Sequence, residues 1–101
     1  MARVQITHWR DIPVLVRAWD GRDEVSRPLS QRFQELVDAV AMQDGLSDAD
    51  AYLAAWRTGP EEARAGPPGA VAEAIAAELE ARFAEIRAHA LRAPNERAGS
   101  T

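Results

Sequence analysis

The chain of 101 residues lacks two amino acids on which much protein chemistry depends. It has no cysteine, and all twelve of its basic residues are arginine, so it has no lysine either. Without cysteine there can be no disulfide, no thiolate nucleophile and no Cys-ligated zinc or iron–sulfur site. Without lysine there is no Walker-A motif, no Schiff-base chemistry and no lysine general base. The two absences exclude several large classes of enzyme.

Long apolar runs and an excess of basic charge are missing as well. No apolar run approaches the ~20 residues of a membrane span, and Met1 leads directly into a strand pattern without a signal peptide. The net charge of −4 argues against general nucleic-acid binding. The charge is also uneven, with a balance of +2 over residues 1–32 and −6 over residues 33–101. We expect a cytoplasmic protein that binds neither membrane nor nucleic acid.

What is present at the N-terminus is the pattern of a small sheet over residues 3–28. Residues 3–9 and 14–19 are rich in β-branched and aromatic types, and the first run alternates with the period of a strand. Asp20-Gly21 favours a tight hairpin turn, because Gly adopts positive φ without steric cost. A short polar strand follows and ends near Pro28. These signals predict a three-stranded antiparallel meander.

Three helices are predicted downstream, at about residues 31–44, 48–57 and 70–92. Ser30 is the expected N-cap of the first and Gly45 its C-cap, Ser47 starts the second, and residues 57–69 form a mobile connector. The third helix either folds back over the chain's own core or docks on another chain. The predicted fold is α+β, with the three helices mainly on one face of the sheet. Residues 1–93 form one domain, and residues 94–101 are expected to be a flexible tail.

The residues that could support catalysis or metal binding are scattered. His8 and Asp11 are close in sequence, but a catalytic pair also needs a nucleophile and a pocket. Two distant histidines without cysteine make a poor zinc site, and the acids from Asp44 to Asp50 lack the spacing of a calcium loop. We therefore predict no catalytic, cofactor-binding or metal-binding residues.

A protein-binding surface is the better-supported hypothesis for the sheet. If Val4, Ile6, Val14 and Val16 face the helices, then Trp9, Leu15, Arg17 and Trp19 lie on the opposite face. Tryptophan and arginine are enriched in binding hot spots. The candidate surface consists of Trp9, Arg10, Asp11, Arg17 and Trp19. The alternative is that one Trp caps the core, and a one-residue change of register at Ile12-Pro13 would exchange the two faces.

The sequence also resembles the virulence-factor domain family. The resemblance is carried by the run Trp9-Arg10-Asp11-Ile12-Pro13, then Val16, Gly21, Arg27 to Glu35, Asp38, Ala41-Met42, Gly45 and Tyr52 to Trp56. The family includes the C-terminal domain of conserved virulence factor C and short free-standing bacterial versions, of which this chain looks like one. The family name describes an infection phenotype and transfers no catalytic residue. Short relatives are associated with folate- and corrinoid-dependent methyl-transfer genes, which implies an accessory role.

Three functions are compatible with these observations. The first is a non-enzymatic adaptor that binds a protein partner through the Trp-bearing end of the sheet. The second is an accessory subunit of an enzyme complex, for example in folate- or corrinoid-dependent methyl transfer. Arg10, Asp11 and Arg17 would then contribute to a site that a methyltransferase or reductase completes. The third is a structural homodimer formed through the third helix. The first is preferred, and no cofactor is expected.

Overall fold

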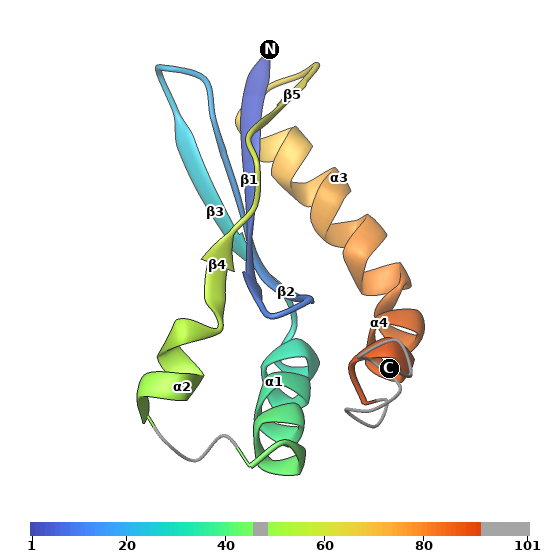
Figure 1. The fold of residues 1–101 in the computed structure, drawn as a ribbon. Coiled ribbons are helices and arrows are strands. Elements are labelled where there is room, and N and C mark those ends of the chain that lie inside the picture. The colour runs from blue at the N-terminus through green and yellow to red at the C-terminus, as the bar shows by residue number, and fades with distance from the viewer. Residues whose placement is uncertain (46–48, 92–101) are drawn as a thin grey trace.

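The fold is an antiparallel sheet with helices against one face and one end, seen in a computed structural model that describes residues 1–45 and 49–91 (Figure 1). Its elements in chain order are β1 (Ala2–Trp9), β2 (Ile12–Trp19), β3 (Glu24–Pro28), α1 (Gln31–Gln43), α2 (Ala49–Ala54), β4 (Trp56–Thr58), β5 (Glu62–Arg64), α3 (Pro68–Ala81) and α4 (Phe83–Ala90). The α+β class is confirmed. The strand and helix numbers both differ from those expected.

The sheet is larger than the predicted meander. The strands β1, β2 and β3 pair in antiparallel fashion as expected, but β4 and β5 both pair with the other edge of β1, so the order is β3-β2-β1-β4. The expectation of a helical end at residues 56–57 and a mobile connector after it was wrong. Three-residue strands carry too little periodicity to be read from sequence, and these two depend on the free edge that β1 offers.

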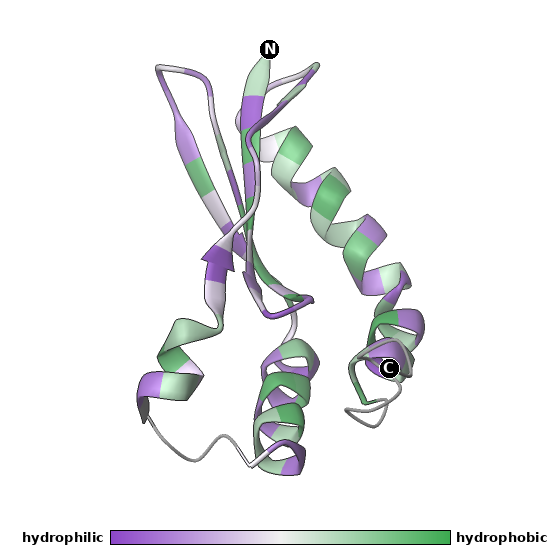
Figure 2. Cartoon of the chain, viewed as in Figure 1, coloured by the Kyte–Doolittle hydropathy of each residue, from purple (hydrophilic) through white to green (hydrophobic). Residues whose placement is uncertain are grey.

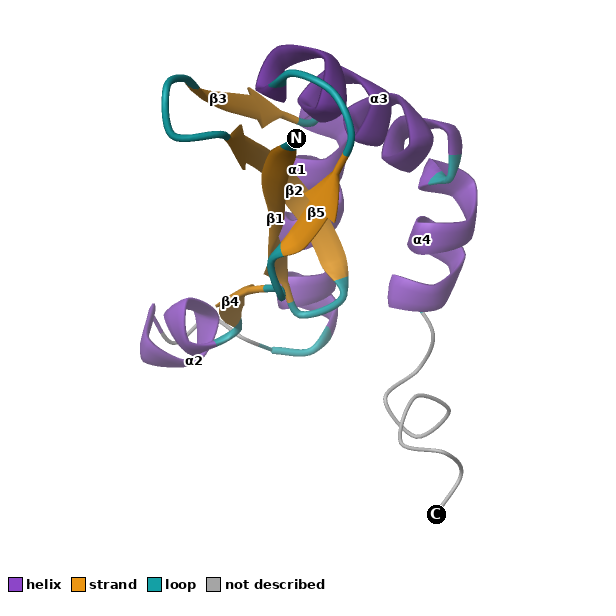
Figure 3. Ribbon diagram, turned by 90° about the horizontal axis from the view of Figure 1, so that it is seen from above, coloured by secondary structure: helices purple, strands orange, loops and turns teal. Residues whose placement is uncertain are grey.

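The inner face of the sheet packs against α3. Val4 pairs with Ala18 and Ile6 with Val16, and all four side chains lie on this face. The helix contributes Val71, Ala72, Ile75 and Ala76 to the same core. It packs mainly on β2 and β3 and less on β1. Figure 3 shows α3 on one side of β1–β3, while the other side of these strands has no helix across its upper part within the described residues.

The helix α1 packs at the end of the sheet rather than over its face. Its buried residues are those of the predicted stripe, Phe33, Leu36, Val37, Val40 and Ala41. Figure 2 shows apolar residues recurring along both α1 and α3. The C-cap of α1 is Asp44 and not the predicted Gly45, which comes one residue later and has the expected left-handed conformation with a φ of 70°. Ser30 makes no side-chain cap bond; its hydroxyl and its backbone N–H both donate to the Glu80 carboxylate instead.

The third predicted helix folds back on the chain's own sheet, but it is broken into α3 and α4. The break lies at Arg82, whose φ is −99° and ψ is 9°. After it, Phe83 contacts Phe33 edge-to-face with ring centroids 4.9 Å apart, which brings α4 beside α1. The contact between the two aromatic rings thus joins α4 to α1 directly after the break.

The remaining expectations concern the second helix, the tail and the membrane. The helix α2 spans six residues and is shorter than predicted. Ser47, its expected first residue, and the tail at residues 94–101 lie outside the described residues. Within residues 1–45 and 49–91, no helix has the length and apolar character to cross a membrane.

Candidate functional site

The β1–β2 turn is the part of the molecule where the most elements meet. Trp9 pairs with Ile12, so only Arg10 and Asp11 connect the two strands. Arg10 has a φ of 54°, in the left-handed region that residues other than Gly rarely adopt. Such a conformation costs about 1–3 kcal/mol, and it persists where the surrounding structure compensates. Contacts from distant parts of the chain provide that compensation.

Both the backbone and the side chain of Arg10 make contacts with distant parts of the chain. Its backbone N–H donates to the Ala55 carbonyl at 2.9 Å, and its own carbonyl accepts from Arg57 Nε at 3.0 Å. Its guanidinium makes an ion pair with Asp44, whose side chain is only 6% exposed. The same guanidinium lies 5.3 Å from the centre of the Trp9 ring. The turn is thus anchored to the end of α1 and to the α2–β4 junction.

Asp11 connects the turn to two further elements. One carboxylate oxygen accepts from Arg57 of β4 at 3.1 Å, and the other lies 3.5 Å from His89 Nε2 of α4. Asp11 is 61% exposed, so each of these pairs contributes less than about 1 kcal/mol. Their role is to bring α4 and β4 to the same corner.

Trp9 lies in the core. The prediction that it is on the open side of the sheet was wrong. It is 0% exposed. Its indole N–H donates to the Tyr52 carbonyl at 3.0 Å, and its ring lies 5.5 Å from the Tyr52 ring. The Tyr52 ring in turn contacts the Trp56 ring edge-to-face, with ring centroids 6.3 Å apart. The α2–β4 segment folds back over this end of the sheet and covers Trp9, which alternation along β1 alone cannot reveal.

Arg17 and Trp19 lie on the uncovered side of the sheet, which is the first of the two registers left open by the sequence. We call this side the open face and define it by six residues of the three-stranded part: Gln5, Thr7, Leu15, Arg17, Trp19 and Ser26. The Arg17 guanidinium lies 4.6 Å from the centre of the Trp19 ring and 3.0 Å from the Glu24 carboxylate. The Arg17 side chain remains 43% exposed. The stacked pair is therefore held in one orientation while still reachable from solvent.

His8 lies near the turn but on the inner face. Burial lowers the pKa of His8 below its ordinary value, and the neighbouring positive charge of Arg57 lowers it further. Gly59 passes close to it: its N–H donates to the Ile6 carbonyl at 2.9 Å, and a Cβ there would meet that oxygen at 3.4 Å. His8 is thus a packed, neutral histidine at pH 7. Among residues 1–45 and 49–91, no three His, Cys, Asp or Glu side chains gather in a way that could hold a metal ion.

The five candidate residues do not form one surface. Arg10 and Asp11 belong to the clamped turn, Trp9 lies beneath it, and only Arg17 and Trp19 share the open face. The partners that hold the turn, Asp44, Ala55, Arg57 and His89, were not identified from sequence. Between 33 and 78 residues separate them from Asp11, as the sequence numbering shows, and no local signal links such positions.

Comparison with known families gives a match over most of the chain. The family model described as "Virulence factor" matches residues 7–91, which include the clamped turn and every residue of the open face except Gln5. The chain belongs to the virulence-factor family. Comparison with curated proteins finds no match, and comparison with solved structures finds none either. The virulence-factor match confirms the resemblance carried by the Trp9–Pro13 run and the residues that follow it.

Proposed function

We propose that this virulence-factor domain is a non-enzymatic interaction module that binds a protein partner through its open face. The stacked Arg17–Trp19 pair is the observation that carries the proposal. A ring fixed by an arginine loses little conformational freedom when a partner covers it, and this lowers the entropic cost of binding. Arginine and tryptophan are also the residues most often found at binding hot spots.

The contacts of the clamped turn support the proposal, because they give Arg10 and Asp11 a structural role. Arg10 and Asp11 make their ion pairs within the chain, so their charges are already compensated. We assign them the role of fixing the junction of β1 and β2. The binding surface is then narrowed to Arg17 and Trp19, with half-buried Leu15 beside them on β2. Leu15 would supply apolar area next to the stacked pair.

Affinity capture from the source bacterium, followed by titration of the purified partner, tests the proposal. We expect Trp19→Ala and Arg17→Ala each to weaken binding by about tenfold or more, since hot-spot truncations typically cost 2 kcal/mol or above (about 30-fold). The matched control is Leu53→Ala, because Leu53 is also a large exposed residue, 62% exposed, but lies on α2. If the Trp19 and Arg17 variants bind the partner with full affinity, the open face is not its binding site.

The accessory-subunit function predicts a different result for the same variants. If the chain completes a methyltransferase or reductase site, Arg17→Ala would reduce the turnover of the partner enzyme while leaving the complex intact. An adaptor predicts that turnover changes only as far as binding does. Homodimerisation through the third helix has less support, because the apolar side of α3 packs on the chain's own sheet.

A further inference from the structure

A second surface lies on the other side of the sheet, where α3 leaves part of β1 uncovered. Two adjoining cavities of about 240 and 330 Å³ lie between β1, the β4–β5 segment and α3. They share Arg64 and Ile75 as lining residues and so lie side by side, the smaller one against β1 and the larger one along α3, and we call the two together the β1–α3 groove. It exists because α3 packs mainly on β2 and β3 and then runs obliquely away from the sheet toward α4 (Figure 1).

The floor of the groove is apolar. Val4, Val71 and Ile75 are core residues whose outer surfaces line it, and Ile6 of β1 is only half-buried. Ala70 and Ala74 of α3 add small side chains at the near wall, which keep the groove open. An apolar hollow of this size bordered by polar groups is typical of a binding site for side chains of a partner.

The charge at the border of the groove is acidic. Glu62 and Arg64 of β5 form an ion pair at 3.3 Å and compensate each other. Glu78 of α3 lines the groove and makes no ion pair with any residue in 1–45 or 49–91. The other two Glu of α3, Glu73 and Glu80, pair with Arg27 and Arg32 and do not line the groove, so the charge at its border comes from Glu78. His8, which also lines the groove, is neutral at pH 7 because burial lowers its pKa. A cationic ligand is therefore favoured over an anionic one.

We propose that the β1–α3 groove binds an amphipathic segment of a partner protein in which apolar side chains are flanked by Lys or Arg. The apolar side chains enter the hollow over Ile6 and Ile75, and a basic side chain reaches Glu78. This is the helix-in-groove mode of recognition, in which an apolar stripe provides affinity and charges at the border provide orientation. The site is independent of the open face and adds a second contact to the same module.

Other occupants fit less well. Residues 92–101 contain no Leu, Ile, Val, Met or aromatic residue, so the chain's own C-terminal segment lacks the side chains that would fill the groove. A second copy is poorly suited too, because the large exposed apolar residues of the described part are separated from one another: Met1 precedes β1, Met42 is on α1 and Leu53 is on α2. A fatty acid would bring its carboxylate toward Glu78 and suffer repulsion.

NMR titration of the full chain with two synthetic peptides tests the proposal. One peptide has Leu and Lys in a helical amphipathic pattern, and the other has Glu in place of each Lys. We expect the Leu/Lys peptide to shift the amide signals of Val4, His8 and Ala74 and to leave those of Arg17 and Trp19 unchanged. The Leu/Glu peptide should bind about tenfold more weakly or not at all.

Two tryptophan variants of α3 then locate the site. Ala74→Trp fills the groove and should weaken binding of the Leu/Lys peptide about tenfold. Ala77→Trp is the matched control, because Ala77 is exposed on the same helix but does not line the groove, and it should change binding by less than about twofold. Glu78→Gln should weaken binding by about threefold and reduce its dependence on salt.

Three results would overturn the proposal. They are the absence of binding by the Leu/Lys peptide, equal affinity for the two peptides, and equal effects of Ala74→Trp and Ala77→Trp. Shifts confined to the open face would likewise exclude the groove, and they would support the function proposed above. Because the two surfaces lie on opposite sides of the sheet, failure at one leaves the other unaffected.

Discussion

The two turns of the N-terminal meander are built in opposite ways. The β2–β3 turn at Asp20–Asp23 is held by its own residues: Asp20 Oδ1 accepts from the backbone N–H groups of Arg22 and Asp23, both at 2.9 Å, and Gly21 has a φ of 92°. The β1–β2 turn has neither a glycine nor a local side-chain bond to its backbone in the described structure. Its left-handed residue is Arg10, held by contacts from α1 and the α2–β4 junction.

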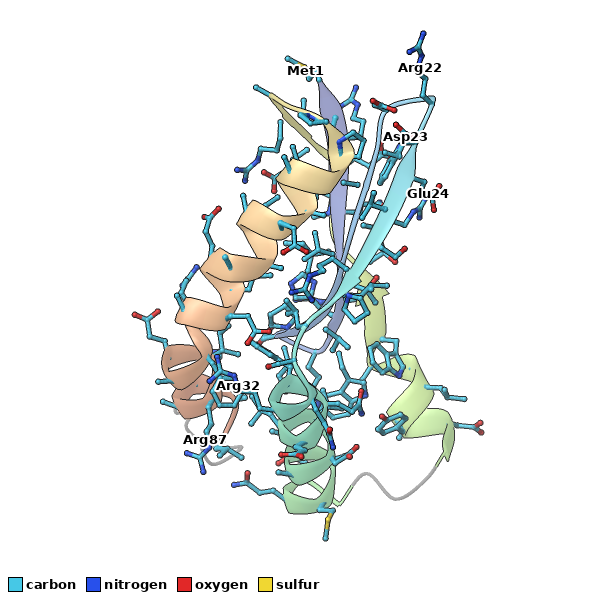
Figure 4. The ribbon with its side chains drawn as sticks, turned by 180° about the vertical axis from the view of Figure 1, so that it is seen from behind. Met1, Arg22, Asp23, Glu24, Arg32 and Arg87 are labelled. Carbon is cyan, nitrogen blue, oxygen red and sulfur yellow. The ribbon has the colours of Figure 1, made fainter. Side chains whose placement is uncertain are left out.

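The difference teaches where each turn's stability comes from. The β2–β3 turn extends from the body of the protein, and Figure 4 shows Arg22 at its tip, with Asp23 and then Glu24 of β3 below it. It can form as soon as its two strands meet. The β1–β2 turn lies against the end of α1 and the α2–β4 junction, whose contacts offset the cost of its strained conformation. The stability of the β2–β3 turn should therefore change with substitutions in the turn itself, and that of the β1–β2 turn with substitutions far away in sequence.

The largest expected effect comes from Asp44→Ala. The substitution removes the carboxylate that pairs with Arg10, and the Asp44 side chain is only 6% exposed. Losing one member of a buried pair costs about 3–5 kcal/mol. Because Arg10 is 35% exposed and can be partly hydrated, we expect a loss of about 2 kcal/mol. Urea unfolding measures it, with Asp38→Ala, an exposed acid on the same helix, as the control. Equal unfolding midpoints for the two variants would show that the clamp contributes nothing.

A double-mutant cycle on Arg10 and Asp44 sharpens the comparison. Arg10→Gly relieves the positive φ but removes the guanidinium that pairs with Asp44, so alone it should destabilise the protein by about 1 kcal/mol. In the Asp44→Ala background only the relief of strain remains, and Arg10→Gly should become neutral or stabilising. We expect a coupling energy of about 1–2 kcal/mol. Additive effects would mean that the ion pair does not hold the turn.

Gly21→Ala breaks the other turn and should cost about 1 kcal/mol, because Ala at a φ of 92° is strained even though a Cβ there meets no atom within 4 Å. The effect is expected to be local. Hydrogen exchange should increase at the β2–β3 turn and its flanking residues, while the amides of Arg10 and Gly59 keep their protection. Increased exchange at the β1–β2 turn would show that the two turns are coupled.

The pH dependence of stability should also separate the two turns, with the smallest effects. The folded-state pKa of His8 is lowered, so the unfolded chain binds protons more readily and stability should fall as the pH drops below about 6.5. His8→Gln should flatten this part of the curve. The pKa of Asp20 is lowered by the two backbone N–H groups it accepts, so its contribution should be lost only as the pH falls below about 4, and Asp20→Ala should remove that part.

These contrasts explain what could be predicted from sequence. The Asp20-Gly21 turn, the α1 stripe and the left-handed conformation of Gly45 after α1 were predicted correctly, because each depends on residues within a few positions of one another. The burial of Trp9 was missed because it depends on Tyr52, 43 residues away. The strands β4 and β5 were missed for the same reason, since they exist only where β1 offers an unpaired edge.

The sequence by itself determined the α+β class, the three-stranded meander, the placement of Arg17 and Trp19 on one face, and membership of the virulence-factor family. Tertiary structure decided which sheet face stays open, how the β1–β2 turn is clamped, and where α3 gives way to α4. Local conformation follows from neighbouring residues, whose contacts cost little entropy to form. The clamp and the groove bring together residues tens of positions apart, and only the packed core fixes which of many such encounters is kept.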